Sequence, residues 1–140
     1  MQSHFMNEFV YKYRVAWVDT DALGVMHFSN YFRICERTEE EFMRAIGLSF
    51  DPSHKVSLPR VKAECTFKYP LRYNDEAIIT MKLKEIGRKH MKYSFEIKNA
   101  SNDIISASCE IVVVAINDQF KSIELPNELI YKIKSFFNEN

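Results

Sequence analysis

The chain has 140 residues, of which 46% are hydrophobic and 27% charged, a composition typical of a soluble globular domain with a substantial core. Lysine plus arginine and aspartate plus glutamate both number 19, so no net charge points to a polyanionic partner such as nucleic acid. No apolar run approaches the length of a membrane span, and the first residues do not look like a signal peptide, so we expect one cytoplasmic domain over residues 1–140.

The first predicted element is a strand at residues 9–18. Apolar and polar side chains alternate there, which is typical of a strand buried on one face. The expected inner face comprises Phe9, Tyr11, Tyr13, Val15 and Trp17.

From residue 30 to residue 46 the apolar residues recur at steps of three and four, which predicts an amphipathic helix. Its apolar stripe comprises Tyr31, Ile34, Cys35, Thr38, Phe42 and Ile46. Ser29 or Asn30 can cap its start, and Gly47 can end it in a left-handed conformation. Opposite charges four residues apart should stabilise its solvent face, namely Arg37 with Glu41 and Glu40 with Arg44.

The rest of the chain reads as four strands and a short helix. Alternating runs predict strands at 61–69, 77–86 and 90–98, and the nearly continuous apolar run at 104–116 predicts a strand covered on both faces. Residues 127–137 can form a terminal helix. Helices segregated from a run of strands indicate an α+β domain, with the long helix on one face of a curved antiparallel sheet of about five strands.

Several kinds of chemistry lack their signatures. The chain has three glycines and no phosphate-binding glycine loop, no GxSxG motif and no HExxH motif. Cys35, Cys65 and Cys109 are far apart in the sequence, and each falls on the apolar side of its segment, so we expect buried free thiols. No cluster of cysteines and histidines suggests a metal site.

The most informative segment is DTDALG, residues 19–24, between the predicted strand and the long helix. One interpretation is a polar turn, because aspartate side chains hydrogen-bond to nearby backbone. The other is catalytic: Asp21 lies just ahead of a helix start, where free backbone N–H groups could polarise a carbonyl oxygen while the carboxylate attacks the carbon or activates water. Position alone does not separate the two, since an acidic residue is also favoured electrostatically near a helix N-terminus.

Residues 18–47, VDTDALGVMHFSNYFRICERTEEEFMRAIG, resemble the hotdog-fold acyl-CoA thioesterases, in particular the 4-hydroxybenzoyl-CoA thioesterase-like enzymes and their Tol-Pal-associated relatives. The family motif is D-x-D-x-x-G, a short aromatic or histidine-bearing stretch, N/S-Y and a helix carrying a glutamate. This chain supplies Asp19, Asp21, Gly24, His27, Phe28, Asn30, Tyr31 and Glu36. The similarity in the order of elements covers about residues 7–120. The motif is specific to the superfamily rather than to a substrate.

The resemblance implies a division of labour within this segment. Asp21 is the catalytic carboxylate, acting as nucleophile or general base on the thioester carbonyl, and the backbone N–H of Phe28 polarises the carbonyl oxygen. Asp19 organises the loop, and Gly24 lets backbone approach the substrate. The Tol-Pal-associated relatives carry a catalytic histidine at the position of Phe28, one residue later than His27, so His27 is open to two interpretations: an acid or base, or a structural histidine.

Residues outside the motif are candidates for substrate binding and support. The resemblance places a basic cluster that faces the phosphates of CoA at Arg88 and Lys89, with His90 assisting, although the same residues could be a solvated strand end. Tyr31 and Glu36 would support the site from the helix. Glu64 would join a polar network near it, or belong to a solvated strand face.

The resemblance further implies a homodimer, and often a homotetramer, with the active site between subunits and the two sheets joined edge to edge. The implied reaction is hydrolysis of an acyl-CoA thioester, with CoA as part of the substrate and no metal or other cofactor. Two alternatives stay open: an enzyme acting on acyl-carrier-protein thioesters, and a non-catalytic module that binds acyl-CoA.

Overall fold

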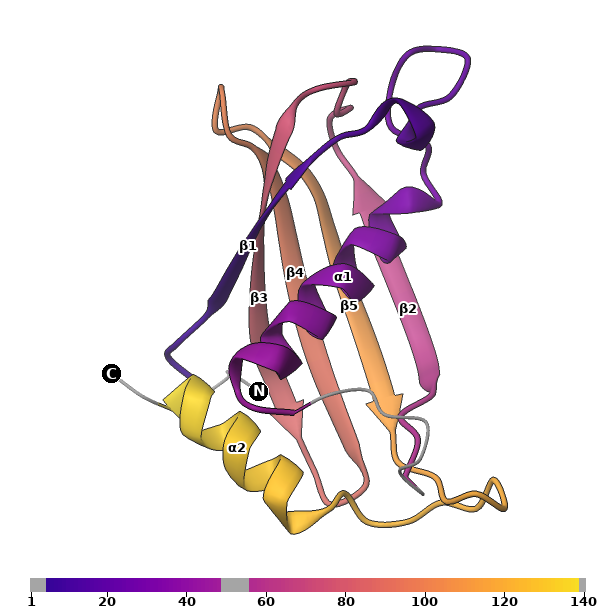
Figure 1. Cartoon of the computed structure of the whole chain (residues 1–140), viewed down its shortest axis with the longest axis vertical. Coiled ribbons are helices and arrows are strands. Elements are labelled where there is room, and N and C mark those ends of the chain that lie inside the picture. Colours follow the sequence, from indigo (N-terminus) through magenta and orange to yellow (C-terminus); the bar gives the residue numbers. More distant parts are fainter. Residues whose placement is uncertain (1–4, 49–55, 139–140) are drawn as a thin grey trace.

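The computed structural model describes residues 5–48 and 56–138. Five strands form one antiparallel sheet in the order β1-β3-β4-β5-β2. Their bounds are β1 Phe9–Arg14, β2 Arg60–Phe67, β3 Glu76–Ile86, β4 His90–Asn99 and β5 Ile105–Val114. The long helix α1, Asn30–Ala45, crosses one face of the curved sheet, and α2, Asn127–Asn138, lies at one end of it (Figure 1). The predicted α+β hotdog architecture is confirmed.

The core fills the space between α1 and the concave face of the sheet. Phe42 of α1 lies 5.6 Å from Phe9 of β1 and 5.2 and 5.0 Å from Phe136 and Phe137 of α2, measured between ring centroids. These edge-on and tilted contacts join both helices to the first strand, so α2 closes the end of the core that α1 leaves open.

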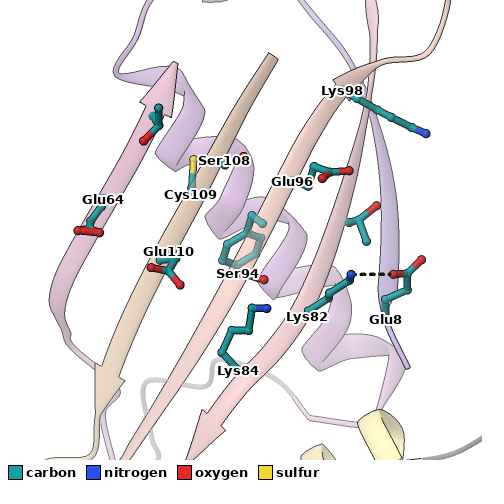
Figure 2. A pocket seen from close by; sticks show the side chains of 13 residues that line it. Glu8, Glu64, Lys82, Lys84, Ser94, Glu96, Lys98, Ser108, Cys109 and Glu110 are labelled. Carbon is teal, nitrogen blue, oxygen red and sulfur yellow. Dashed lines mark ion pairs between the residues drawn. The ribbon is translucent and has the colours of Figure 1, made fainter. Parts of the chain in front are cut away.

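The sheet is apolar toward the helix and polar on the opposite face. Ala77, Ile79, Met81 and Leu83 of β3 are buried, as the alternation predicted, and their neighbours point the other way. Figure 2 shows this outer face, with Lys82, Glu96 and Glu110 on the side of the sheet away from α1. No helix covers it among the described residues.

Two expectations about apolar faces are wrong. The first strand ends at Arg14, and Trp17 begins a short 3-10 turn, Trp17–Asp19, where its side chain is 80% exposed. The alternation at 61–69 predicts one buried face that includes Val61, Phe67 and Tyr69, but this face is largely uncovered, because β2 ends the sheet and α1 only partly reaches it. Val61, Phe67 and Tyr69 are 59%, 48% and 56% exposed.

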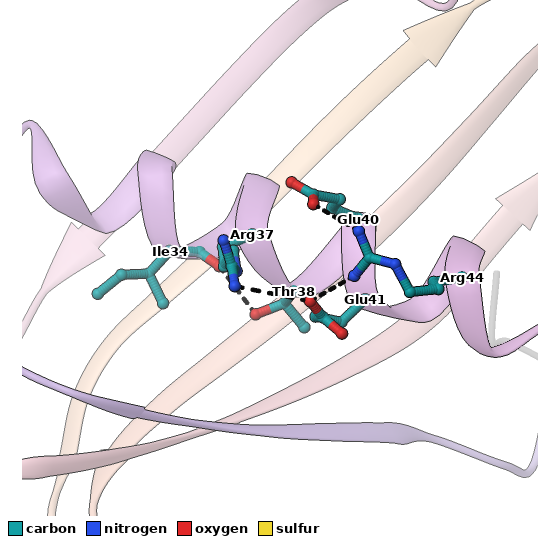
Figure 3. A network of polar contacts seen from close by, with 6 residues as sticks. All are labelled: Ile34, Arg37, Thr38, Glu40, Glu41 and Arg44. Atoms are coloured by element: carbon teal, nitrogen blue, oxygen red, sulfur yellow. Dashed lines mark hydrogen bonds and ion pairs between the residues drawn. The ribbon is translucent and has the colours of Figure 1, made fainter. Parts of the chain in front are cut away.

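Helix α1 ends as the sequence predicted. Gly47 has φ +83°, and the N–H of Leu48 donates to the carbonyl of Met43 at 2.8 Å, so the last turn closes through a left-handed glycine. The expected surface pairs are present as well. Arg44 lies 2.9 Å from Glu40 and Arg37 lies 3.7 Å from Glu41 (Figure 3).

The three cysteines are free, and Cys35 and Cys109 are buried as predicted. Cys65 is only half-buried, because it lies on the partly uncovered edge strand β2. Within residues 5–48 and 56–138, no helix is long and apolar enough to cross a membrane.

Candidate active site

The loop that joins β1 to α1 is organised around Asp19. Its side chain is buried, and its Oδ2 accepts hydrogen bonds from the Tyr13 hydroxyl at 2.6 Å and from the Ala16 N–H at 2.8 Å. Its backbone carbonyl accepts from the N–H of His27 and from the side-chain amide of Asn30, each at 2.8 Å. One residue therefore ties the end of β1 to the start of α1.

The Tyr13–Asp19 contact stays intact at neutral pH. Burial, followed by the hydrogen bond and the negative charge of Asp19, raises the pKa of Tyr13 to about 12. The phenol therefore remains a hydrogen-bond donor to the carboxylate across the physiological range.

Residues 20–26 form a small hairpin at the edge of this loop. Thr20 pairs with Met26, the Asp21 N–H donates to Val25 at 2.9 Å, and Gly24 turns the chain with φ +78°. The Met26 N–H donates to the Leu71 carbonyl at 2.7 Å, which pins the hairpin to the segment before β3. A Cβ at Gly24 would meet nothing within 4 Å in this chain, so the left-handed backbone accounts for this glycine.

Asp21 holds one carboxylate oxygen in place and leaves the other available. Oδ1 accepts a hydrogen bond from the Leu23 N–H at 2.8 Å, which is the geometry of an Asx turn. Oδ2 has no hydrogen-bond partner among the described residues. The side chain is half-buried, so its orientation is fixed by the turn while one oxygen can reach a bound molecule.

Among the described residues, the turn that leads into α1 leaves one backbone donor unused. The Asn30 N–H donates to His27 at 3.0 Å, the Tyr31 N–H donates to Phe28 at 3.3 Å, and the Ser29 N–H donates to Nδ1 of His27 at 3.2 Å. The Phe28 N–H has no hydrogen-bond partner within the described part of the chain. The expected cap is wrong in one respect, because the Ser29 side chain makes no capping bond to the helix backbone.

Asp21 and Phe28 line the same cleft, an open hollow of about 420 Å³. Its other lining residues are Val25, Met26, Tyr31, Phe67, Lys68, Tyr69 and Pro70. The ring of Phe67 lies edge-on to those of Tyr31 and Phe28, with centroids 5.1 and 6.4 Å away. The residues that carry the carboxylate and the amide therefore line one aromatic-walled depression beside the end of β2.

Tyr31 fixes the floor of this cleft. Its side chain is buried, and its hydroxyl lies 3.1 Å from the Ser106 hydroxyl, which in turn donates to the Tyr69 carbonyl at 2.5 Å. The helix is thereby joined to β5 and to the segment after β2.

The basic cluster lies away from this cleft. Arg88, Lys89 and His90 are at the β3–β4 turn, at the opposite end of the sheet from residues 20–28 (Figure 1). Arg88 forms an exposed ion pair with Glu124, and His90 lies 3.3 Å from Glu85. A Cβ at Gly87 would come within 2.6 Å of the His90 ring, so the imidazole packs over this glycine.

Two supporting glutamates also lie apart from Asp21. Glu64 pairs with Lys62 at 3.5 Å and faces the outer side of the sheet, as Figure 2 shows. Glu36 lines a groove between β1 and α1, and its carboxylate makes no hydrogen bond to the 19–28 loop among the described residues. Asn30 holds that loop instead, a role that its place in the motif could have suggested.

The lining residues Phe67 and Tyr69 were not singled out from the sequence. They alternate with polar neighbours, which is typical of a strand face in the core, and a binding cleft needs the same large apolar surface. In the part of the chain that the structure describes, no group of three or more His, Cys, Asp or Glu side chains is arranged to hold a metal ion.

Comparison with known proteins places this chain in a family. A 1,4-dihydroxy-2-naphthoyl-CoA hydrolase from Rippkaea orientalis is 30% identical over 95% of this chain and 99% of its own length. The hydrolase of the same name from Nostoc punctiforme is 29% identical, over 87% of this chain and 84% of its own. The crystal structure of a 1,4-dihydroxy-2-naphthoyl-CoA thioesterase from Synechocystis superposes with a TM-score of 0.86 at 23% identity, covering 91% of this chain and 96% of that one, a likeness of fold.

The family model described as the thioesterase-like superfamily matches residues 15–133, a span that contains the Asp21 loop, the whole of α1 and all strands after it. The link to Tol-Pal-associated enzymes remains a prediction. This chain belongs to the thioesterase-like superfamily of hotdog proteins.

Proposed function

We propose that this chain hydrolyses an acyl-CoA thioester to a free acid and CoA in the cleft between Asp21 and Phe28. The observation that carries the proposal is that one cleft is lined by Asp21 and Phe28, whose carboxylate Oδ2 and backbone N–H both lack a hydrogen-bond partner among the described residues. Thioester hydrolysis requires these two functions, a nucleophile or base and a donor to the carbonyl oxygen. The family and the names of the related hydrolases support the same reaction.

The steps follow from this arrangement. The Phe28 N–H donates to the thioester oxygen and stabilises the negative charge that develops there, an effect worth roughly 3 kcal/mol of barrier. Asp21 either attacks the carbonyl carbon, giving an anhydride that water then cleaves, or removes a proton from the attacking water. Either route breaks the carbon–sulfur bond, and the CoA thiolate leaves and takes up a proton.

The acyl group is aromatic. The rings of Phe28, Tyr31, Phe67 and Tyr69 line the cleft, and planar groups stack or pack edge-on against such walls. The names of related proteins, which refer to a dihydroxynaphthoyl thioester, support this class of substrate.

The active unit is a homodimer, or a tetramer built from such dimers. The exposed apolar residues of β2 lie at the free edge of the sheet, next to the cleft. Two-fold pairing of β2 edges would reverse the strand direction and bring the partner's β3–β4 turn toward the cleft. Arg88 and Lys89 of one copy would then bind the CoA phosphates of a thioester held by Asp21 of the other.

Sedimentation at assay concentrations tests this assembly. We expect a mass of at least twice 16.5 kDa under conditions of full activity. A fully active monomer would contradict the dimer and the shared CoA site.

A panel of thioesters tests the reaction and its substrate. We expect thiol release from aromatic acyl-CoAs to exceed release from straight-chain acyl-CoAs, and CoA esters to exceed pantetheine esters that lack the nucleotide phosphates. If the protein hydrolyses acyl-carrier-protein thioesters faster than acyl-CoAs, the carrier in the substrate is acyl carrier protein and not CoA. Tight binding without release of CoA would contradict catalysis altogether.

A further inference from the structure

The backbone N–H groups at the start of α1 need hydrogen-bond partners from outside the helix. The first N–H groups of a helix have no partner inside the helix, and each is satisfied by a cap, by solvent or by a ligand. The helical turn begins before Asn30, since the Ser29 backbone has φ −64° and ψ −24° and the Tyr31 N–H donates to the Phe28 carbonyl at 3.3 Å. The residue in the capping position is therefore His27, whose carbonyl accepts the Asn30 N–H at 3.0 Å.

The imidazole of His27 completes that cap. Its Nδ1 accepts the Ser29 N–H at 3.2 Å and lies 2.8 Å from the Ser29 hydroxyl. An N-cap side chain accepts from the second or third helical residue, and Ser29 is the second residue after His27. To accept the Ser29 N–H, Nδ1 must carry no proton, which places the proton of the neutral ring on Nε2, whereas an Nδ1 that carried the proton would donate to the Ser29 hydroxyl and leave the Ser29 N–H uncapped.

His27 is itself fixed from the other side. Its backbone N–H donates to the Asp19 carbonyl at 2.8 Å, and its ring packs on the Phe28 ring with centroids 4.5 Å apart. The residue therefore joins the buried Asp19 to the first turn of α1. The Phe28 amide lies between these two anchors, and its N–H is the one that the turn leaves unpaired.

We infer that His27 is a positioning residue, which aims the Phe28 N–H by capping the Ser29 N–H through Nδ1, and that it is neither the acid nor the base of the reaction. This inference rests on the proposed function of the Phe28 amide. A ring whose Nδ1 accepts a backbone N–H has its proton on Nε2 and its one ring lone pair engaged, so that lone pair is not free to act as a base. The acid form of the ring would carry a proton on Nδ1 as well, and that proton would break the cap on the Ser29 N–H. Of the two interpretations that the sequence leaves open for His27, this inference favours the structural one.

Two substitutions separate the cap from the ring. His27→Asn keeps an acceptor oxygen near the place of Nδ1 and removes the ring, whereas His27→Phe keeps the ring against Phe28 and removes the acceptor. A donor that acts in the transition state affects kcat more than KM, so we expect His27→Phe to lower kcat about tenfold with KM nearly unchanged. His27→Asn should stay within about threefold of the wild-type kcat, because asparagine is a good N-cap.

The measurements are thiol release from the best acyl-CoA of the panel and the nitrogen-15 spectrum of the His27 ring, recorded at about pH 8. We expect the Nε2–H tautomer in the wild-type spectrum. Thermal unfolding checks that each variant is folded at the assay temperature. If the cap served only the stability of the fold, a variant that is still folded at that temperature would keep the wild-type kcat.

The outcomes are distinct. Wild-type turnover by His27→Phe, a spectrum with the proton on Nδ1, or a loss in His27→Asn as large as in His27→Phe would each overturn the positioning role. If the wild-type protein releases CoA from no thioester, the proposed function fails instead, and the tautomer still reports whether the cap exists.

Discussion

Asp21→Asn is expected to lower kcat for thioester hydrolysis by about a hundredfold or more, because an amide is neither a useful nucleophile nor a general base. The substitution leaves the local structure in place. Asparagine can accept the Leu23 N–H through its Oδ1 as the aspartate does, and the side chain is only half-buried. Steady-state kinetics with an aromatic acyl-CoA, together with circular dichroism of the variant, measures this effect.

Asp19→Asn is the matched control, two residues away in the same loop. Asp19 is buried and accepts from Tyr13 and from the Ala16 N–H, so its amide variant weakens a buried network at a cost of about 1–3 kcal/mol of folding stability. We expect Asp19→Asn to lower the unfolding midpoint and Asp21→Asn to leave it nearly unchanged. Hydrolysis by Asp21→Asn at close to the wild-type rate would remove Asp21 from the chemistry.

The fold could be predicted from the sequence because burial alternates locally. In β3 every second residue from Ala77 to Leu83 is buried, and in α1 the stripe from Tyr31 to Phe42 faces the sheet. Such patterns depend on one element and the face it covers. Trp17 and the apolar face of β2 follow the same alternation, yet they are exposed. An alternating run does not show where the strand ends or whether another element covers its apolar face.

The site was harder to read because its contacts join distant segments. Asp21 and Phe28 could be named from a motif, but the aromatic wall from Phe67 to Pro70 is brought to them only by the sheet. Residue type favours Ser29 or Asn30 as the cap of α1, whereas the His27 ring accepts the Ser29 N–H in the structure. A histidine is an uncommon cap, so composition gave no signal for it.

The burial of Glu39 could have been predicted from the sequence but was not. Glu39 lies four residues after Cys35 and three before Phe42, on the apolar stripe of α1, within a run of three glutamates that reads as solvent-facing. Its side chain is fully buried and forms an ion pair with Arg60 at the start of β2. The helical spacing correctly predicts that Glu39 is buried, whereas its charge suggests an exposed position.

The second large effect is expected from Arg60→Met, which leaves that carboxylate buried without its counter-charge. Glu39 Oε1 pairs with the guanidinium, and Oε2 has no hydrogen-bond partner among the described residues. Removing one member of a buried pair costs about 3 kcal/mol or more, whereas exposed pairs contribute little. Arg44→Met, which breaks the solvent-facing pairs of the same helix shown in Figure 3, should change the unfolding free energy much less.

The pH dependence of this loss identifies its cause. Burial raises the pKa of Glu39 above its ordinary value of 4.5, and the nearby Arg60 opposes that rise without overcoming it. The folded state therefore holds this proton to higher pH than the unfolded state, and stability from Glu39 is present at acid pH and lost as pH rises through the folded pKa. Without Arg60 the pKa rises further, so the destabilisation by Arg60→Met should be greatest at neutral pH and shrink as pH falls toward 4.5.

Urea unfolding of wild type, Arg60→Met and the double variant Arg60→Met/Glu39→Gln, at fixed protein concentration and two pH values, separates charge from packing. Glutamine fills nearly the same volume and cannot ionise, so the double variant should lose the pH-dependent part of the destabilisation and keep the part due to the missing arginine stem. If Arg60→Met is equally destabilised at acid and neutral pH, the buried charge of Glu39 is not its cause. If it unfolds at the wild-type urea concentration, the pair contributes nothing to holding β2 against α1.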